Sequence, residues 1–243
     1  MNAIPVPLSR ASAWRPGLAS NGAEVPRHSE VFAPASEGTG AALALAFAQD
    51  QLAIDERPWL WVQDKAALRL SGRPYRPGLP PALRHRLIHV AAKSPEDALF
   101  ALEEGLRCRD LAFVIGELAG NPKALSFTAS RRLSLATEKH GVPLWLVRLD
   151  ARRDLGSARL RWEVRASPSA PPRWNGQAPG APAWRAELFR ARGHPPGEWI
   201  LGEEGEGLVA RVGGWPSTGL GRAGFGLGTT PAQAEPVEAL AHG

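Results

Sequence analysis

Residues 28–48, HSEVFAPASEGTGAALALAFA, are the stretch that decides the fold of this 243-residue chain. Glu30 to Ala33 is predicted as a short strand, Pro34 to Gly40 as a loop, and Ala41 to Ile54 as a helix rich in alanine and leucine. A strand, a loop of small residues and a helix N-terminus together form a common phosphate-binding setting, because the first helical N–H groups are free. The stretch therefore predicts an α/β fold with a functional loop.

The alternation of strand and helix continues outward from this stretch to residue 149. Pro58 to Gln63 and Leu111 to Ile115 are unbroken apolar runs, as expected of buried parallel strands. Ser94 predicts a helix start, since a serine cap is followed by proline and two acids. Further strands are expected at 87–90 and 143–149, a helix at 126–140 and a long loop at 64–86. The order predicts a mostly parallel sheet with helices on both faces.

The pattern changes after residue 154. Ala158 to Arg165 alternates apolar and charged residues, which predicts a half-buried, antiparallel strand. Trp184 to Arg192 and Glu198 to Leu201 are expected to form a small hairpin. Composition divides the chain into an irregular arm (1–27), a core (28–166), a proline-rich linker with a small basic extension (167–212) and a disordered glycine-rich tail (213–243).

Composition excludes several classes of protein. The single cysteine, Cys108, cannot form an internal disulfide and is expected to be a buried small hydrophobe. The longest apolar run, Ala41 to Ala48, is too short to span a bilayer, and the first residues do not resemble a signal peptide. The six histidines have no metal-ligand spacing with cysteine or acids. We therefore expect a soluble cytoplasmic protein without a metal site.

The loop after the first strand departs from the phosphate-binding pattern GxxxxGK[ST]. Ala33 replaces the first glycine, Thr39 replaces the lysine, and Gly40 replaces the residue that would hold magnesium. Glu37 adds negative charge where phosphates would lie. We interpret the segment as a vestigial phosphate loop. Its residues are Ala33, Ser36, Gly38, Thr39 and Gly40.

The metal-binding acid of such a site is also missing from its expected position. Gly116 follows the run LAFVI directly, and Glu117 comes one residue late, which in a strand means the opposite face. Without the lysine and this acid we expect no catalytic residues and no nucleotide cofactor. A DNA-dependent ATPase is the alternative, in which Lys65 or Arg131 would have to reach the phosphates. A second glycine pattern, at 219–224, lacks the strand and helix that a dinucleotide site needs.

Positive charge is concentrated in one segment. The chain has a formal net charge of +5, and residues 148–192 contain ten arginines against four acids, a local charge of +6. This excess predicts contact with a polyanion or an acidic partner, although a solvated arginine surface is the alternative. The candidate DNA- or partner-binding residues are Arg131, Arg132, Arg152, Arg153, Arg159, Arg161 and Arg165, the last three on one strand face.

Four segments of the core resemble the ImuA family: HSEVFAPASEGTGAALALAFA, RPWLWVQD, RLIHVAAKSPEDALFALEEGLRCRDLAFVIGEL and TASRRLSLATEKHGVPLWLVR. The resemblance covers residues 28–166 and implies a RecA-like core. It implies an accessory role in the SOS response to DNA damage, in error-prone translesion synthesis and SOS mutagenesis. The implied partners are an ImuB-like Y-family polymerase homologue and an error-prone replicative-type polymerase, with RecA and single-stranded DNA as further candidates. A cell-division inhibitor related to RecA, or a plain single-strand binder, remains an alternative.

Overall fold

The computed structural model describes residues 6–7, 28–52, 55–169, 171–172, 174–192, 196–204 and 207–211. Their strands form one sheet in the order β1-β10-β9-β8-β7-β2-β6-β5-β3-β4. The parallel strands are β2 (His28–Ala33), β3 (Trp59–Gln63), β4 (Leu87–Ala91), β5 (Val114–Ala119), β6 (Leu144–Leu149) and β7 (Leu160–Ala166). The antiparallel strands are β8 (Ala183–Ala191), β9 (Gly197–Glu204), β10 (Gly207–Arg211) and β1 (Val6–Pro7). The predicted α/β class, a mostly parallel sheet flanked by helices with an antiparallel extension, is confirmed.

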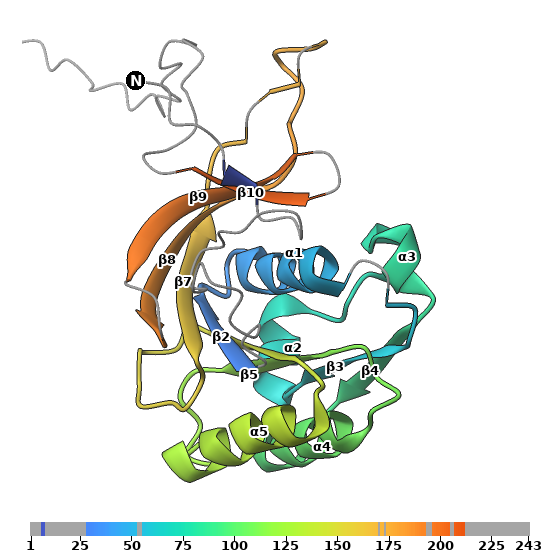
Figure 1. Cartoon of the computed structure of the whole chain (residues 1–243), viewed down its shortest axis with the longest axis vertical. Helices are drawn as coiled ribbons and strands as arrows, with labels where there is room; N and C mark the ends of the chain where they lie inside the picture. The colour runs from blue at the N-terminus through green and yellow to red at the C-terminus, as the bar shows by residue number, and fades with distance from the viewer. Residues whose placement is uncertain are drawn as a thin grey trace, which may run out of the picture.

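Helices cover the two faces of the parallel strands (Figure 1). One face packs against α1 (Thr39–Leu52), α2 (Lys65–Ser71) and α3 (Pro81–Arg84), and the other against α4 (Pro95–Arg107) and α5 (Phe127–His140). The hydroxyl of Ser94 caps α4 by accepting the N–H of Asp97 at 3.1 Å, as predicted. Gly141 ends α5 in the left-handed region, with φ of 80°. No helix in the described part of the chain is long and apolar enough to cross a membrane.

The segment 64–86, predicted as a loop, contains α2, a 3₁₀ turn at Arg76–Gly78 and α3. Its first helix starts because the carboxylate of Asp64 accepts the N–H of Ala67 at 2.6 Å. The prolines and glycines that suggested a loop lie between these short elements. The prediction was wrong because a helix of seven residues with one buried position, Ala67, leaves no periodic apolar signal.

The antiparallel strands curve over α1 (Figure 1). Trp162 on β7 contacts Phe47 of α1 and Trp199 of β9, with ring centroids 5.4 and 6.1 Å apart. The apolar face predicted for the strand at 158–165 is therefore correct. Its predicted orientation is half right, since β7 is parallel to β2 and antiparallel to β8. The predicted hairpin is present as β8 and β9.

The fifth strand lies further along the chain than predicted. The run Leu111–Ile115 was expected to be the strand, but β5 begins at Val114 and continues to Ala119. The polar Glu117 inside it is buried and hydrogen-bonded, and Gly116 is needed because a Cβ there would lie 2.9 Å from a methyl of Leu146. The predicted tail (213–243) and most of the predicted arm lie outside the described residues, so neither prediction is tested.

Candidate functional site

The loop at 34–38 follows β2, the strand at which the chain switches from adding strands on one side of the sheet to adding them on the other. Strand β2 lies between β6 and β7, and the chain leaves β2 toward β3 but leaves β6 toward β7. In open α/β sheets, ligands bind outside the carboxyl ends of strands at such a switch point. The sequence-predicted vestigial phosphate loop therefore lies where a nucleotide site is expected from topology.

Acidic side chains of the chain itself hold this loop. The carboxylate of Asp150, just after β6, accepts the backbone N–H of Ala35 at 2.9 Å. The carboxylate of Glu37 accepts the backbone N–H of Ala166, the last residue of β7, at 2.7 Å. One carboxylate thus takes a backbone N–H of the loop, and a second one, on the loop itself, is held at the end of β7. Their charge disfavours a second anion there.

Close packing fixes the start of the helix that follows the loop. A Cβ on Gly40 would lie 2.7 Å from Cγ1 of Val147 and 2.8 Å from Cβ of Ala33. A serine or threonine at this position, which the phosphate-binding pattern requires for magnesium, would meet the same two atoms. Gly40 therefore serves the packing of α1 against β6 and β2.

Strand β5, which would carry the metal-binding acid, has no acidic residue next to the loop. Register places Ala119 of β5 beside Leu149, which in turn lies beside Ala33. Glu117 lies two residues before Ala119 in β5 and is buried. Its carboxylate accepts hydrogen bonds from Trp61 Nε1 at 3.2 Å and Gln63 Nε2 at 2.6 Å. Burial raises the pKa of Glu117. Among the described residues, no three His, Cys, Asp or Glu side chains are grouped as around a metal ion.

Neither Lys65 nor Arg131, the two possible substitutes for the missing lysine, lies near the loop. Lys65 is the first residue of α2, directly after β3, and β3 is three strands away from β2. At about 4.8 Å per strand this is a separation of about 14 Å, more than a lysine side chain spans. Arg131 lies on α5, on the opposite face of the sheet from α1, in a pocket that contains no loop residue.

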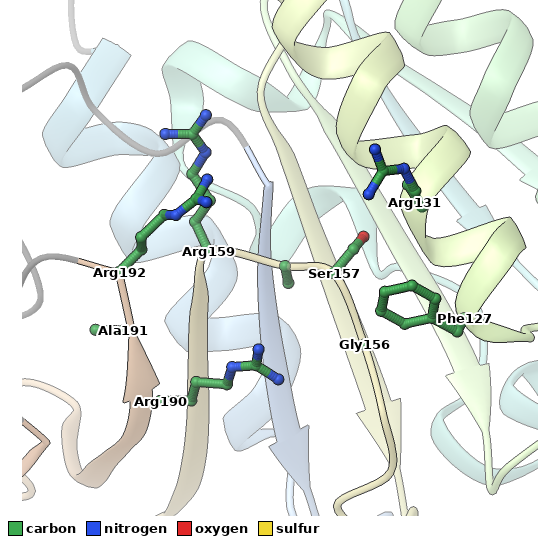
Figure 2. Close-up of a pocket in the computed structure, with 9 residues that line it drawn as sticks. Phe127, Arg131, Gly156, Ser157, Arg159, Arg190, Ala191 and Arg192 are labelled. Atoms are coloured by element: carbon green, nitrogen blue, oxygen red, sulfur yellow. The ribbon is translucent and has the colours of Figure 1, made fainter.

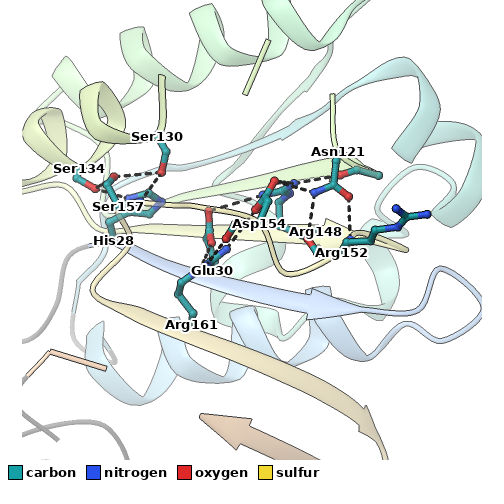
Figure 3. A network of polar contacts seen from close by, with 11 residues as sticks. His28, Glu30, Asn121, Ser130, Ser134, Arg148, Arg152, Asp154, Ser157 and Arg161 are labelled. Carbon is teal, nitrogen blue, oxygen red and sulfur yellow. Dashed lines mark hydrogen bonds and ion pairs between the residues drawn. The ribbon is translucent and has the colours of Figure 1, made fainter. Parts of the chain in front are cut away.

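Arg161 is buried, which corrects its prediction as a binding residue. Its Nε lies 2.5 Å from the Glu30 carboxylate, and only 3% of the Arg161 side chain is exposed. Arg148 of β6 is equally buried and lies 3.7 Å from the same carboxylate (Figure 3). Arg161 lies on the predicted polar face of β7, but the segment 150–158 covers that face and removes Arg161 from solvent. Its residue Asp154 contacts both guanidinium groups, at 3.1 and 3.2 Å.

A chain of hydroxyl groups continues this polar layer toward α5 (Figure 3). His28 Nδ1 lies 2.7 Å from the Ser134 hydroxyl, which lies 2.6 Å from that of Ser157. The other ring nitrogen of His28 is buried without a hydrogen-bond partner. Burial, with a contribution from Arg161, lowers the pKa of His28 to about 3. His28 is therefore neutral, and its hydrogen bond to Ser134 joins β2 to α5.

Four of the remaining predicted arginines form ion pairs at the surface. Arg132 pairs with Glu103 and Arg159 with Glu138, each at 2.5 Å. Arg153 contacts Glu163 and Glu187 and lies over the ring of Phe189, 4.2 Å from its centroid. Arg165 is 3.7 Å from Glu163 and largely exposed. These pairs leave the side chains accessible but partly neutralised, and their role in binding stays a prediction.

The last two predicted arginines have exposed side chains with no partner among the described contacts. Arg152 is held through its backbone, whose N–H donates to Asn121 Oδ1 at 2.8 Å. Arg131 projects from α5 into a pocket of about 320 Å³ (Figure 2). The structure brings Arg131 and Arg159 together there and leaves Arg152 and Arg165 outside the pocket.

Two arginines of this pocket were missed by sequence analysis. Arg190 and Arg192, at the end of β8, line it together with Phe127 and the segment 156–158. Their spacing of two residues places both on one face of a strand, a signal that was available in the sequence. What the sequence did not show is that this strand end lies beside α5.

Comparison with known proteins gives one clear relationship. No family model matches the chain. Two curated proteins, both named Protein ImuA and both from strains of Caulobacter vibrioides, are 35% identical to it over 189 residues. The aligned region covers 72% of this chain and 73% of each relative.

Proposed function

The chain belongs to the ImuA family, and from this premise we propose that it is a non-catalytic, RecA-like adaptor in SOS-induced, error-prone translesion DNA synthesis. Its partners are an ImuB-like polymerase homologue and an error-prone replicative-type polymerase, as the resemblance implies, and we place the chain in the cytoplasm. The RecA-like core serves in this role as a binding scaffold, and nucleotide turnover is not part of it.

The occupied phosphate loop is the observation that carries the proposal. Asp150 accepts a backbone N–H of the loop, and the loop's own Glu37 accepts the N–H of Ala166, so two negative charges lie at the switch point. A nucleotide would have to displace the Asp150 carboxylate and bind beside Glu37 without the attraction of a loop lysine. Loss of such a cation removes a main source of transition-state stabilisation in phosphoryl transfer.

Capture of purified partners by the full chain tests the adaptor role. The immobilised chain is expected to retain the ImuB-like homologue and, through it or directly, the error-prone polymerase. A catalytically active Y-family polymerase from the same organism serves as the control and is expected to pass through. Retention of neither partner would contradict the proposal.

Phosphate release tests the non-catalytic part separately. With ATP, magnesium and single-stranded DNA, the chain is expected to release phosphate no faster than buffer. DNA-stimulated turnover that disappears in Lys65→Ala or Arg131→Ala would contradict the proposal and establish an ATPase with an unorthodox site.

A further inference from the structure

We propose that the pocket bounded by Arg131, Arg159, Arg190 and Arg192 binds the phosphodiester backbone of single-stranded DNA, with the ring of Phe127 as a stacking surface for a base. The inference deepens the proposed function and rests on it, because it assigns the nucleic-acid contact of the adaptor to one place. It adds two residues, Arg190 and Arg192, to the predicted arginines of the site.

The pocket has an excess of positive charge. Among the described contacts, Arg159 is paired with Glu138, whereas Arg131, Arg190 and Arg192 have no carboxylate partner. Three exposed guanidinium groups around one cavity repel each other, and an anion shared between them removes this repulsion. The planar fork of each guanidinium matches the oxygens of a phosphate group.

Three elements form the pocket from different parts of the chain. Figure 2 shows Arg131 and Phe127 on α5 at one side, and Arg159, Arg190 and Arg192 on the neighbouring strand ends at the other. Residues 156–158 line the pocket between the two sides, and a Cβ on Gly156 would lie 3.1 Å from the buried Glu30 carboxylate. The pocket has a volume of about 320 Å³ and can take a group that enters from solvent.

An exposed aromatic ring beside the arginines favours a single strand over a duplex. Phe127 is 50% exposed and lines the pocket, so its ring is accessible from solvent beside the arginines. Bases of single-stranded DNA stack on such rings while arginines contact the backbone. In a duplex the bases are stacked on each other and cannot reach the ring. An acidic protein would use the arginines but gain no comparable stacking from Phe127.

Fluorescence anisotropy with the full chain and a labelled oligothymidine tests the assignment. The double variant Arg190→Ala/Arg192→Ala removes two phosphate contacts, so the slope of log K against log salt is expected to become shallower by about 1.4. Phe127→Ala is expected to weaken binding about fivefold or more, because one stacked base is lost. Arg185→Ala is the matched control, since this exposed arginine is also on β8 but lies outside the pocket.

Several results would overturn the assignment. One is a loss in Arg185→Ala equal to that in the double variant, which would indicate a diffuse charge effect. Others are equal affinity for a duplex of the same length, an unchanged affinity of Phe127→Ala, or equally tight, equally sensitive binding of polyglutamate. None of these changes partner capture or phosphate release, so failure here is distinguishable from failure of the proposed function.

Discussion

The carboxylate of Asp150 accepts the backbone N–H of Ala35 at 2.9 Å, and the N–H of Asp150 donates to the carbonyl of Ala33 at 3.0 Å. These two contacts close the end of β6 onto the loop after β2. Asp150 adopts a left-handed backbone conformation, with φ of 49°, which is uncommon for residues other than glycine and tolerated by aspartate. The loop is thus held in place from within the chain, in a position where related folds hold a phosphate.

Gly40→Ala is expected to destabilise the fold by about 1–3 kcal/mol, because the new methyl group meets Val147 and Ala33 at less than contact distance. Urea denaturation measures the change in the free energy of unfolding. Gly38→Ala is the control two residues earlier, at the end of the loop, since a Cβ there has no neighbour within 4 Å. Equal stability of the two variants would show that α1 does not pack as closely on β6 as described.

Glu30→Ala is expected to cost about 3 kcal/mol, since it leaves the two buried arginines, Arg148 and Arg161, with only the partly exposed Asp154 as a carboxylate partner. Chemical denaturation again provides the measurement. Glu138→Ala removes an exposed partner of Arg159 and should cost no more than about 1 kcal/mol. A small effect of Glu30→Ala would mean that the two arginines reach solvent and that Arg161 is available for binding after all.

Stability is expected to fall as the pH falls below neutrality, because His28 is buried in its neutral form. Its folded pKa of about 3 lies below the unfolded value of 6.5, so the folded state resists protonation. This stabilisation is present above pH 6.5 and is lost progressively toward pH 3, with about 2 kcal/mol lost between pH 7 and pH 5.

Unfolding free energies of the chain and of His28→Gln, measured over this range, check the assignment. The variant should show a smaller decline with acid, whereas His85→Gln, which changes an exposed histidine, should decline like the parent chain. A decline that His28→Gln does not alter would place the responsible group elsewhere.

Cys108 is expected to react with Ellman's reagent in the native protein. The structure places it exposed at the end of α4, where sequence analysis expected a buried residue. One thiol per chain should react without denaturant, at a rate near that of the unfolded chain, and Cys108→Ser should abolish the signal. Protection of the thiol until unfolding would show that the C-terminal end of α4 is covered.

The order of strands and helices in the core could be predicted because its elements have strong local signals. The capping pattern at Ser94 and the terminal glycine at Gly141 set the limits of two helices correctly. The loop at 34–38 was also identified from sequence, because its strand and helix neighbours are unambiguous. What the sequence did not contain is which groups hold that loop, since the Asp150 carboxylate and the Ala166 N–H lie more than a hundred residues away in the chain.

The surface was harder to predict than the core. An arginine on an alternating strand has the same pattern whether its face meets solvent or a covering segment, so Arg161 was misplaced. Arg190 and Arg192 were overlooked for the reverse reason, because only the folded chain shows that they lie beside Arg131. Contacts between segments that are distant in the sequence decide whether Arg161 is buried and where Arg190 and Arg192 lie. A local sequence pattern contains no information on such contacts.

Calorimetric titration of the full chain with magnesium and a nonhydrolysable adenine nucleotide tests the central claim most directly. With Asp150 and Glu37 in the loop, we expect no saturable heat of binding at millimolar nucleotide. Saturable binding of one nucleotide per chain would contradict the account, because the loop would have to give up its contact with Asp150 and accept a triphosphate beside Glu37 without a lysine.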